Sequence, residues 1–435
     1  MWGSAVRVAV LGGGVVGLAC AWELARAGCS VSVIERGRCG TGASRGNAGW
    51  ITPFLCTPRP GPGALGQAFA AMVRPHGPVR VRPRFDREFA AWAWGFWRSC
   101  SGARHEAGTR AMIDLARQAP GAYDRLRLGG IEFEMHCDGL LVAALTAAGL
   151  EEFVRLHAAL AERGYGGEAQ VIERRDLRRI EPALHDRVLG ALYLTAERHV
   201  RPETVSAGLV AALTSRGAAV VEGVGARALE PLGPRGWRIR MDGGSHVTCD
   251  RVVVACGADS KALLGGLGFR IPLEPAKGVS VTASGGGMPP GRPIKMAEAV
   301  VACSPFRGAV RLSGTFDLGD GHTVVNRRRL SGVIESAAAY LRDWTPERVE
   351  FTWAGLRPVT PDDLPAIGPV PGLPGIYAAT GHGMLGVTLA AITAELLAPL
   401  ILEDRFSPVL APFLPARFAA AGGAPAAALR TIVGR

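Results

Sequence analysis

The apolar positions at the start of the chain predict a strand, a helix and a second strand within residues 6–35. The first apolar run ends at Leu11, and the second strand covers residues 31–34. A glycine-rich turn lies between the first strand and the helix, and an acidic residue, Glu35, ends the second strand. This order of elements is typical of a unit that binds a dinucleotide.

The glycine turn has the spacing G-x-G-x-x-G, with Gly12, Gly14 and Gly17 at the glycine positions. The first glycine permits a tight turn, the second lets a pyrophosphate approach the backbone, and the third lets the helix pack closely on the strand. The helix N-terminus offers free N–H groups to the phosphates, and the carboxylate of Glu35 can bind ribose hydroxyls. These residues predict a dinucleotide site, and by themselves they leave both NAD and FAD open.

The later apolar runs predict short strands and helices without an internal repeat. Strands are expected over 140–144, 220–224, 251–257, 279–283, 310–312 and 375–379, and a hairpin over 237–249. Helices are expected over 85–128, 150–163, 200–217 and 328–341 and after Gly383, and a flexible loop over 285–291. Strands of the nucleotide-binding type fall near the start, near Val253 and near Tyr377, so we expect a discontinuous nucleotide domain with a second domain built from the insertions.

Aromatic side chains share one helix face in the stretch 85–128, at Phe89, Trp92 and Phe96. Buried aromatic residues usually serve packing, so a helix core is the favoured interpretation, and an aromatic substrate cage is the alternative. The insertion over residues 73–100 is rich in arginine and tryptophan and is expected to shape the pocket.

Composition narrows the classes of partner. The 435 residues carry a formal net charge of +11, but the arginines form only short runs, so a nucleic-acid partner is not expected. Nine cysteines without a C-x-x-C pair favour reduced thiols in the cytoplasm and no metal site. The apolar stretch 385–402 contains Glu395, which is costly in lipid. We therefore expect a cytoplasmic protein without an integral membrane segment, and peripheral contact with a membrane stays open.

Three further motifs extend the N-terminal pattern. Residues 42–49 have the sequence GASRGNAG, residues 252–260 have VVVACGADS, and residues 355–386 hold the series G-x-R-P, T-P-D, P-x-x-G and G-H-G-x-x-G. Together with the glycine turn, these motifs resemble the D-amino-acid oxidase-like superfamily of FAD-dependent oxidoreductases, and most closely its D-amino-acid dehydrogenase and glycine oxidase branch. The resemblance covers nearly the whole chain and is most specific at its two ends.

The resemblance implies an α/β fold with a discontinuous FAD-binding Rossmann-like domain and an α+β substrate domain that contains an antiparallel sheet. The expected FAD-binding segments are 1–57, 165–270 and 352–435, and the expected substrate-binding segments are 58–164 and 271–351. The residues expected to bind FAD are Gly12, Gly14, Val15, Val16, Gly17, Glu35, Arg36, Ala43, Ser44, Asn47, Ala48, Gly49, Val224, Ala255, Gly257, Gly381, Gly383, Met384, Leu385, Gly386 and Val387.

The resemblance also implies a substrate site. Arg357 matches the arginine of the G-x-R-P motif, which binds the amino-acid carboxylate in the family through two parallel hydrogen bonds. His382 is expected beside the substrate or the flavin as the second catalytic residue. A structural salt bridge and a structural histidine are the respective alternatives. The chain has Gly355 where sarcosine oxidases carry the cysteine that links flavin, and Gly46 where dimethylglycine-type enzymes carry a linking histidine, so FAD is expected to be non-covalent.

The expected reaction is oxidation of the C–N bond of an amino acid or related amine by hydride transfer to flavin N5. Oxygen, a quinone and a carrier protein stay open as electron acceptors. One alternative is a tailoring oxidase of secondary metabolism that acts on a cyclic, N-alkylated or carrier-bound amine, and another is a non-catalytic flavin-binding subunit. An NAD-dependent dehydrogenase is disfavoured, because residues 223–225 do not open a second glycine fingerprint.

Overall fold

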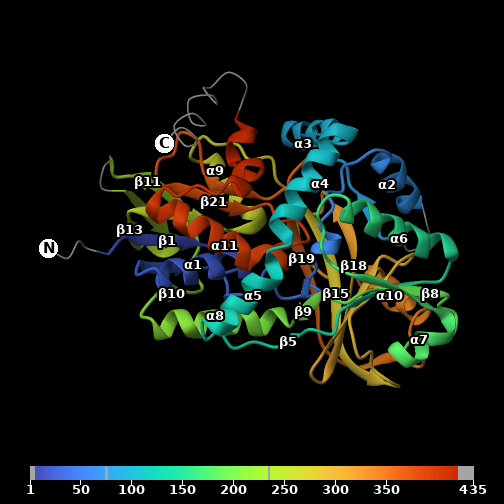
Figure 1. Ribbon diagram of the computed structural model, residues 1–435. Helices are drawn as coiled ribbons and strands as arrows, with labels where there is room; N and C mark the ends of the chain where they lie inside the picture. Colours follow the sequence, from blue (N-terminus) through green and yellow to red (C-terminus); the bar gives the residue numbers. More distant parts are fainter. Residues whose placement is uncertain (1–4, 74–76, 234–235, 420–435) are drawn as a thin grey trace.

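The computed structural model describes residues 5–73, 77–233 and 236–419. Two units lie side by side, one around a six-stranded sheet and the other around a nine-stranded sheet (Figure 1). The long helix α11 (Gly386–Glu403) lies in the first unit with α1 (Val15–Arg26), against which it packs.

The six-stranded sheet has the order β10-β2-β1-β14-β21-β20. Its first five strands are parallel, and β20 is antiparallel to β21. The bounds are β1 Arg7–Leu11, β2 Ser30–Ile34, β10 Ala219–Val221, β14 Arg251–Val254, β20 Ala366–Pro369 and β21 Ile376–Thr380. The predicted nucleotide-binding strands near the start, near Val253 and near Tyr377 are therefore confirmed as neighbours in one sheet.

Alternate residues of β1 face two hydrophobic cores, because successive side chains of a strand point to opposite faces. Val8 and Val10 belong to the core under α1 and α11, and Ala9 and Leu11 belong to the core on the other face. Helices α4 (Gly102–Ala116), α5 (Ala119–Leu128) and α8 (Pro202–Ser215) extend the first layer. The second core includes the antiparallel sheet of β11 (Ala226–Pro231), β12 (Trp237–Met241) and β13 (His246–Cys249), and next to it α9 (Ser260–Gly265).

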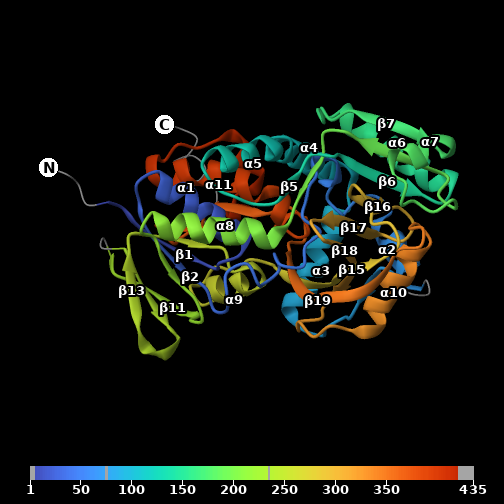
Figure 2. The ribbon, with the colours of Figure 1, turned by 90° about the horizontal axis from the view of Figure 1, so that it is seen from below.

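The nine-stranded sheet has the order β19-β15-β18-β17-β16-β6-β8-β7, and β4 pairs with β18. The bounds are β4 Val79–Val81, β6 Leu140–Ala144, β7 Ala169–Glu173, β8 Gly190–Leu194, β15 Glu274–Gly286, β16 Ile294–Met296, β17 Val301–Phe306, β18 Ala309–Leu318 and β19 Thr345–Val359. Most pairs are antiparallel, as expected for the second domain. Figure 2 shows β7 and the β11–β13 sheet at opposite ends of the molecule.

Shorter elements complete the fold. The remaining helices are α2 (Ala64–Val73), α3 (Arg87–Ser99), α6 (Ala147–Ala161), α7 (Arg174–Ile180) and α10 (Arg327–Ala338). A small sheet joins β3 (Trp50–Ile51), β5 (Met135–His136) and β9 (Arg198–Val200). The 3-10 turns are η1 (Pro53–Leu55), η3 (Asp242–Gly244), η4 (Gly257–Asp259), η5 (Pro408–Phe413) and η6 (Pro415–Phe418).

Three local expectations differ from the structure. The helical stretch 85–128 is three helices, and the expected strand 220–224 ends at Val221, before Val224. The expected loop 285–291 begins inside β15, because Gly285 and Gly286 pair with β19. The strand pairing also places β7 and β8 in the nine-stranded sheet, and we propose to move their residues from the FAD-binding segments to the substrate domain.

Within the described residues, α11 is the one helix that is long and apolar enough to span a membrane. Two thirds of it, 67%, is buried inside the protein, where it packs on α1, α4 and α5. Its Glu395 forms an ion pair with Arg125 of α5 at 2.6 Å. The helix is thus placed as a core element of the first unit.

Candidate functional site

A large cavity, with a volume of about 1530 Å3, is lined by residues of both units. Its walls include the turn after β1, the end of β2, residues 40–48, strands β18 and β19, and the start of α11. Ligand pockets for one small molecule usually measure about 300–1,000 Å3. The volume is therefore sufficient for an extended dinucleotide together with a small substrate.

The turn after β1 depends on two glycines. Gly12 has φ +103°, a left-handed conformation that strains other residues, and a Cβ there would lie 2.5 Å from the carbonyl oxygen of Ala255. A Cβ on Gly17 would lie 2.0 Å from the carbonyl oxygen of Gly12, so the third glycine permits the close packing of α1. Gly17 serves this packing and does not line the cavity.

Glu35 stands at the end of β2 on the cavity wall. Its Oε2 accepts a hydrogen bond from the N–H of Gly13 at 2.7 Å, and its Oε1 accepts one from the N–H of Gly37 at 2.8 Å. These two bonds fix the carboxylate, and each oxygen keeps a lone pair for a ribose hydroxyl. Its neighbour Arg36 pairs with Asp259 at 2.9 Å, and both of these residues also line the cavity.

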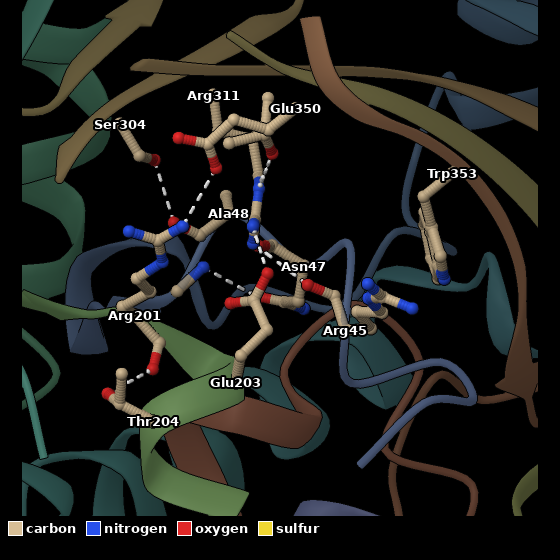
Figure 3. A network of polar contacts seen from close by, with 12 residues as sticks. Arg45, Asn47, Ala48, Arg201, Glu203, Thr204, Ser304, Arg311, Glu350 and Trp353 are labelled. Carbon is tan, nitrogen blue, oxygen red and sulfur yellow. Dashed lines mark hydrogen bonds and ion pairs between the residues drawn. The ribbon is translucent and has the colours of Figure 1, made fainter. Parts of the chain in front are cut away.

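The loop 42–49 lies across the N-terminus of α1 and is held from both units. Ser44 Oγ accepts a hydrogen bond from the N–H of Val15 at 3.0 Å. From the nine-stranded sheet, Ser304 donates to the carbonyl of Ala48 at 2.7 Å, and Arg311 donates to the carbonyl of Asn47 at 2.8 Å (Figure 3). The loop is thus fixed at the junction of the two units.

Arg311 is the centre of this network (Figure 3). Its side chain is fully buried, and Nη1 also donates to the carbonyl of Arg45 at 2.9 Å. Nη2 forms an ion pair with Glu203 of α8, and Nε donates to Thr282 Oγ1 at 2.8 Å. Burial lowers the pKa of Arg311, and the carboxylate of Glu203 opposes that shift. No sequence pattern indicates a role for this residue, because all of its hydrogen-bond partners are at least 29 positions away.

The second glycine turn joins β21 to α11. Residues 383–387 line the cavity, so the N-terminus of α11 faces it with unpaired backbone N–H groups and the positive end of the helix dipole. His382 also lines the cavity, but it is only 5% exposed and its Nε2 bonds to Thr393 Oγ1 of α11 at 3.1 Å. Burial lowers the pKa of His382 to about 3, so the ring is neutral at pH 7. The geometry favours a role in holding the turn against α11.

Arg357 reaches the cavity from β19. Its Nη1 donates to the carbonyl of Thr315 at 2.9 Å, and Thr315 has φ +64°, a strained conformation for a β-branched residue. Asp317, which acts electrostatically on Arg357, is itself paired with Arg329. Within the described ranges no carboxylate forms an ion pair with Arg357. The alternative of a structural salt bridge therefore finds no partner there.

The electrostatic setting of Arg357 is cationic. Burial lowers the pKa of Arg357 to about 10, and the charge of Arg59 adds to the lowering. The group stays protonated at pH 7, and its positive charge has no carboxylate ion-pair partner within the described ranges. Such a site suits an anionic group of a ligand.

Most of the residues predicted to form the site share this one cavity. On its wall lie Gly12, Gly14, Val15, Val16, Glu35, Arg36, Ala43, Ser44, Asn47, Ala48, Ala255, Gly257, Arg357, His382, Gly383, Met384, Leu385, Gly386 and Val387. Away from the wall lie Gly17, Gly49, Val224 and Gly381. Gly49 abuts the carbonyl of Val200, and the N–H of Val224 bonds to the carbonyl of Glu35, so these two support the wall from behind. The roles of these residues in binding stay predictions.

Trp353 lies between Gly46 and Gly355, the two positions on which the expectation of non-covalent FAD rests. A Cβ on Gly46 would lie 2.1 Å from Trp353 Cδ2, and a Cβ on Gly355 would lie 1.8 Å from Cζ2. The indole Nε1 donates to the carbonyl of Gly42 at 3.2 Å, which fixes the ring. Neither glycine position has room for a side chain while the indole stays where it is.

The aromatic face of α3 is both core and cavity wall. Phe89, Trp92 and Phe96 pack in the small core with Val359, and all three line the cavity. Trp92 Nε1 donates to the carbonyl of Val359 at 2.9 Å. The favoured interpretation as helix core is therefore incomplete, because the same face bounds the site.

Three basic cavity residues were missed in the sequence, Arg59, Arg227 and Lys295. Arg59 lies in the proline- and glycine-rich loop 58–63, which predicts only a turn, and Lys295 lies on the short strand β16. Burial lowers the pKa of Lys295 to about 8. Lys295 is one of three lysines in the chain and lies on an apolar strand. This unusual position is the sequence feature that could have indicated a role.

Two glycine turns, the carboxylate at the end of β2 and the guanidinium of Arg357 on β19 surround one cavity, an arrangement that suits a dinucleotide and an anionic ligand. The family model for FAD-dependent oxidoreductases (DAO) matches residues 7–400, and the chain belongs to this family. The residues fit FAD, because the glycine cradle admits no Cβ at Gly12, the carboxylate of Glu35 is oriented at the end of β2, and the cavity is large enough.

Among known proteins, the chain is similar to a D-amino acid dehydrogenase of Xylella fastidiosa (strain M12), with 32% identity over 406 residues, 91% of this chain and 92% of that protein. The fold is similar to glycine oxidase from Geobacillus kaustophilus, with TM-score 0.73, 23% identity, and 94% and 98% of the two chains covered. It is also similar to L-amino acid deaminase from Proteus vulgaris, with TM-score 0.72, 17% identity, and 95% and 97% covered. The chain is thus an FAD-dependent oxidoreductase with relatives that act on amino acids.

Proposed function

We propose that this protein oxidises the C–N bond of an amino acid or related amine, and that Arg357 binds the carboxylate of the substrate. The observation that carries the proposal is the cationic side chain of Arg357, without an ion-pair partner among the described residues, on the wall of the cavity that also contains both glycine turns. Relatives that act on D-amino acids and glycine support the same class of substrate.

In this proposal the protein acts mainly by positioning. The carbonyl of Thr315 orients the guanidinium of Arg357, which holds the carboxylate through two hydrogen bonds and thereby directs the α-hydrogen. FAD supplies the hydride acceptor at N5 when it is bound. The substrate amine enters uncharged, because its lone pair assists departure of the hydride. The product is an imine, which water converts to a keto acid and ammonia.

We further propose that FAD is held non-covalently. Trp353 fills the space beside Gly46 and Gly355, and no side chain stands at either position to form a link. Precipitation with acid is then expected to release the yellow cofactor into the supernatant. Colour that stays on the precipitated polypeptide would contradict this proposal.

Anaerobic reduction of the flavin tests the reaction. The purified enzyme is mixed with D-amino acids, L-amino acids, glycine, N-methyl amino acids and cyclic amines, and loss of flavin absorbance is followed in a stopped-flow instrument. We expect rapid bleaching by at least one amino acid. Bleaching only by amines without a carboxylate would favour the alternative of a tailoring oxidase, and no bleaching by any compound would favour the non-catalytic subunit.

The variant Arg357→Met tests the carboxylate anchor. Loss of two charge-assisted hydrogen bonds is expected to weaken binding of the amino acid by at least about 100-fold. The variant should still bind FAD.

Reoxidation of the reduced enzyme with oxygen, a quinone or a carrier protein then identifies the electron acceptor.

A further inference from the structure

Arg59 is a second guanidinium on the cavity wall, and it comes from a loop that carries no motif. Its backbone is restricted, because Pro58 precedes it and Pro60 follows it, and a residue before proline favours extended conformations. The N–H of Arg59 donates to Asp363 Oδ2 at 3.0 Å. The loop is therefore fixed at the residue that faces the cavity.

The side chain of Arg59 is fixed as firmly as its backbone. Nε donates to Asp363 Oδ2 at 2.8 Å, and Nη2 donates to Asp363 Oδ1. The guanidinium also stacks over the ring of Phe316, with the central carbon 4.1 Å from the ring centroid. One carboxylate and one aromatic ring thus supply these three contacts. One nitrogen of the guanidinium takes part in neither hydrogen bond.

That nitrogen is Nη1, which is buried and has no hydrogen-bond partner in the described part of the chain. A buried donor without an acceptor is unfavourable, so an acceptor from a ligand is the natural complement. The two arginines contact adjacent residues of β18. The carbonyl of Thr315 accepts a hydrogen bond from Arg357, and the ring of Phe316 stacks against the guanidinium of Arg59. The two guanidinium groups are therefore placed by consecutive positions of β18.

We propose that Arg59 Nη1 is a second anchor for the carboxylate that Arg357 binds, an inference that rests on the proposed function. The charges fix how many carboxylates the pair takes. Asp363 already neutralises Arg59, so the two arginines and one aspartate leave a single uncompensated positive charge. One carboxylate neutralises it, with Arg357 supplying the charge and Arg59 a hydrogen bond. The two arginines therefore bind one carboxylate of the amino acid together.

The variant Arg59→Gln tests this anchor, and Arg417→Gln is the matched control. Arg417 pairs with Asp362, next to Asp363, but it does not line the cavity. The probes are acetate and its uncharged counterpart acetamide, and binding to the FAD-loaded enzyme is read from the flavin absorbance spectrum. We expect Arg59→Gln to weaken acetate binding by about 10- to 100-fold and acetamide binding by less than about threefold. Arg417→Gln should change neither.

The same variants are then compared with a reducing amino acid and its amide. Arg59→Gln should raise the concentration for half-maximal flavin reduction for the acid only, and Arg59→Lys should give an intermediate value. Equal loss for acid and amide, or an unchanged affinity for acetate, would overturn the role of Arg59. Wild-type enzyme that no amino acid reduces would instead overturn the proposed function, and the anchor with it.

Discussion

Replacement of Arg311 by methionine is expected to weaken both the fold and the binding of FAD. The change removes four hydrogen bonds, from a side chain with no exposed surface, to Thr282, Arg45, Asn47 and Glu203. The three bonds to neutral acceptors are worth about 1 kcal/mol each, and the bond to the carboxylate about 1.5–3 kcal/mol. The sum, about 5 kcal/mol, agrees with the 3–5 kcal/mol that loss of one member of a buried ion pair usually costs.

The expected loss is a large share of the total, because the free energy of unfolding of a protein is about 5–15 kcal/mol. It is measured by urea unfolding followed by circular dichroism, with and without FAD. The dissociation constant of FAD should rise about tenfold, because the loop 42–49 must then be ordered when FAD binds. Quenching of flavin fluorescence gives that constant.

Arg201→Met is the matched control. Arg201 pairs with Glu350 at 3.0 Å in the same network, but both side chains are partly exposed, so the loss should stay below about 1 kcal/mol (Figure 3). A double variant with Glu203→Gln should cost little more than Arg311→Met alone. A loss for Arg311→Met no greater than that for Arg201→Met would refute the central role of Arg311.

Three further predictions concern buried groups. Burial raises the pKa of Glu197 from 4.5 to about 7. The protonated carboxyl group therefore contributes fully to the stability of the fold below pH 4.5, and this contribution is lost as the pH rises through 7. Glu197→Gln should therefore gain stability over the wild type between pH 5 and 8, by about 3 kcal/mol at pH 8 in thermal unfolding, and equal pH profiles would contradict this. Gly355→Ala should lose about 1–3 kcal/mol and weaken FAD binding, because the new Cβ displaces the indole of Trp353, and titration with FAD checks it. Lys277→Met removes the buried partner of Asp320 at 2.6 Å and leaves only the more exposed Arg82 and His322, so the free energy of unfolding should fall by about 3 kcal/mol, and a fully stable variant would contradict this.

The two ends of the chain were predictable from local patterns, since a glycine turn between a strand and a helix has the same chemistry wherever it occurs. The turns at Gly12 and Gly383 and the guanidinium of Arg357 all reach the cavity, as their motifs predict. The prediction of a loop over 285–291 was wrong at its start, because contacts with a distant strand decide the conformation there and the local pattern does not. Gly285 and Gly286 have low strand propensity, but pairing with β19 outweighs it.

Residues that act between distant segments could not be predicted. Arg59 pairs with Asp363, which is 304 positions away, and a sequence of prolines and glycines around it indicates only a loop. Arg311 lies 266 positions from the carbonyl of Arg45 that it binds. No period or spacing along the chain encodes such contacts, because they arise only when two sheets pack. The role of His382 likewise became interpretable only once its bond to Thr393 was known.

The strand order of the six-stranded sheet links cofactor loading to protein synthesis. β1 and α1 emerge first from the ribosome, but β21 and α11, which complete the same sheet and its cover, emerge some 370 residues later. At about 5–20 residues per second, roughly 20 to 70 s separate the two events. Throughout that interval the cavity around FAD cannot close, and once β14 has emerged its edge stays unpaired until β21 follows. We therefore expect FAD to be captured only after translation has passed α11, and chains that stop earlier to be colourless and prone to aggregation.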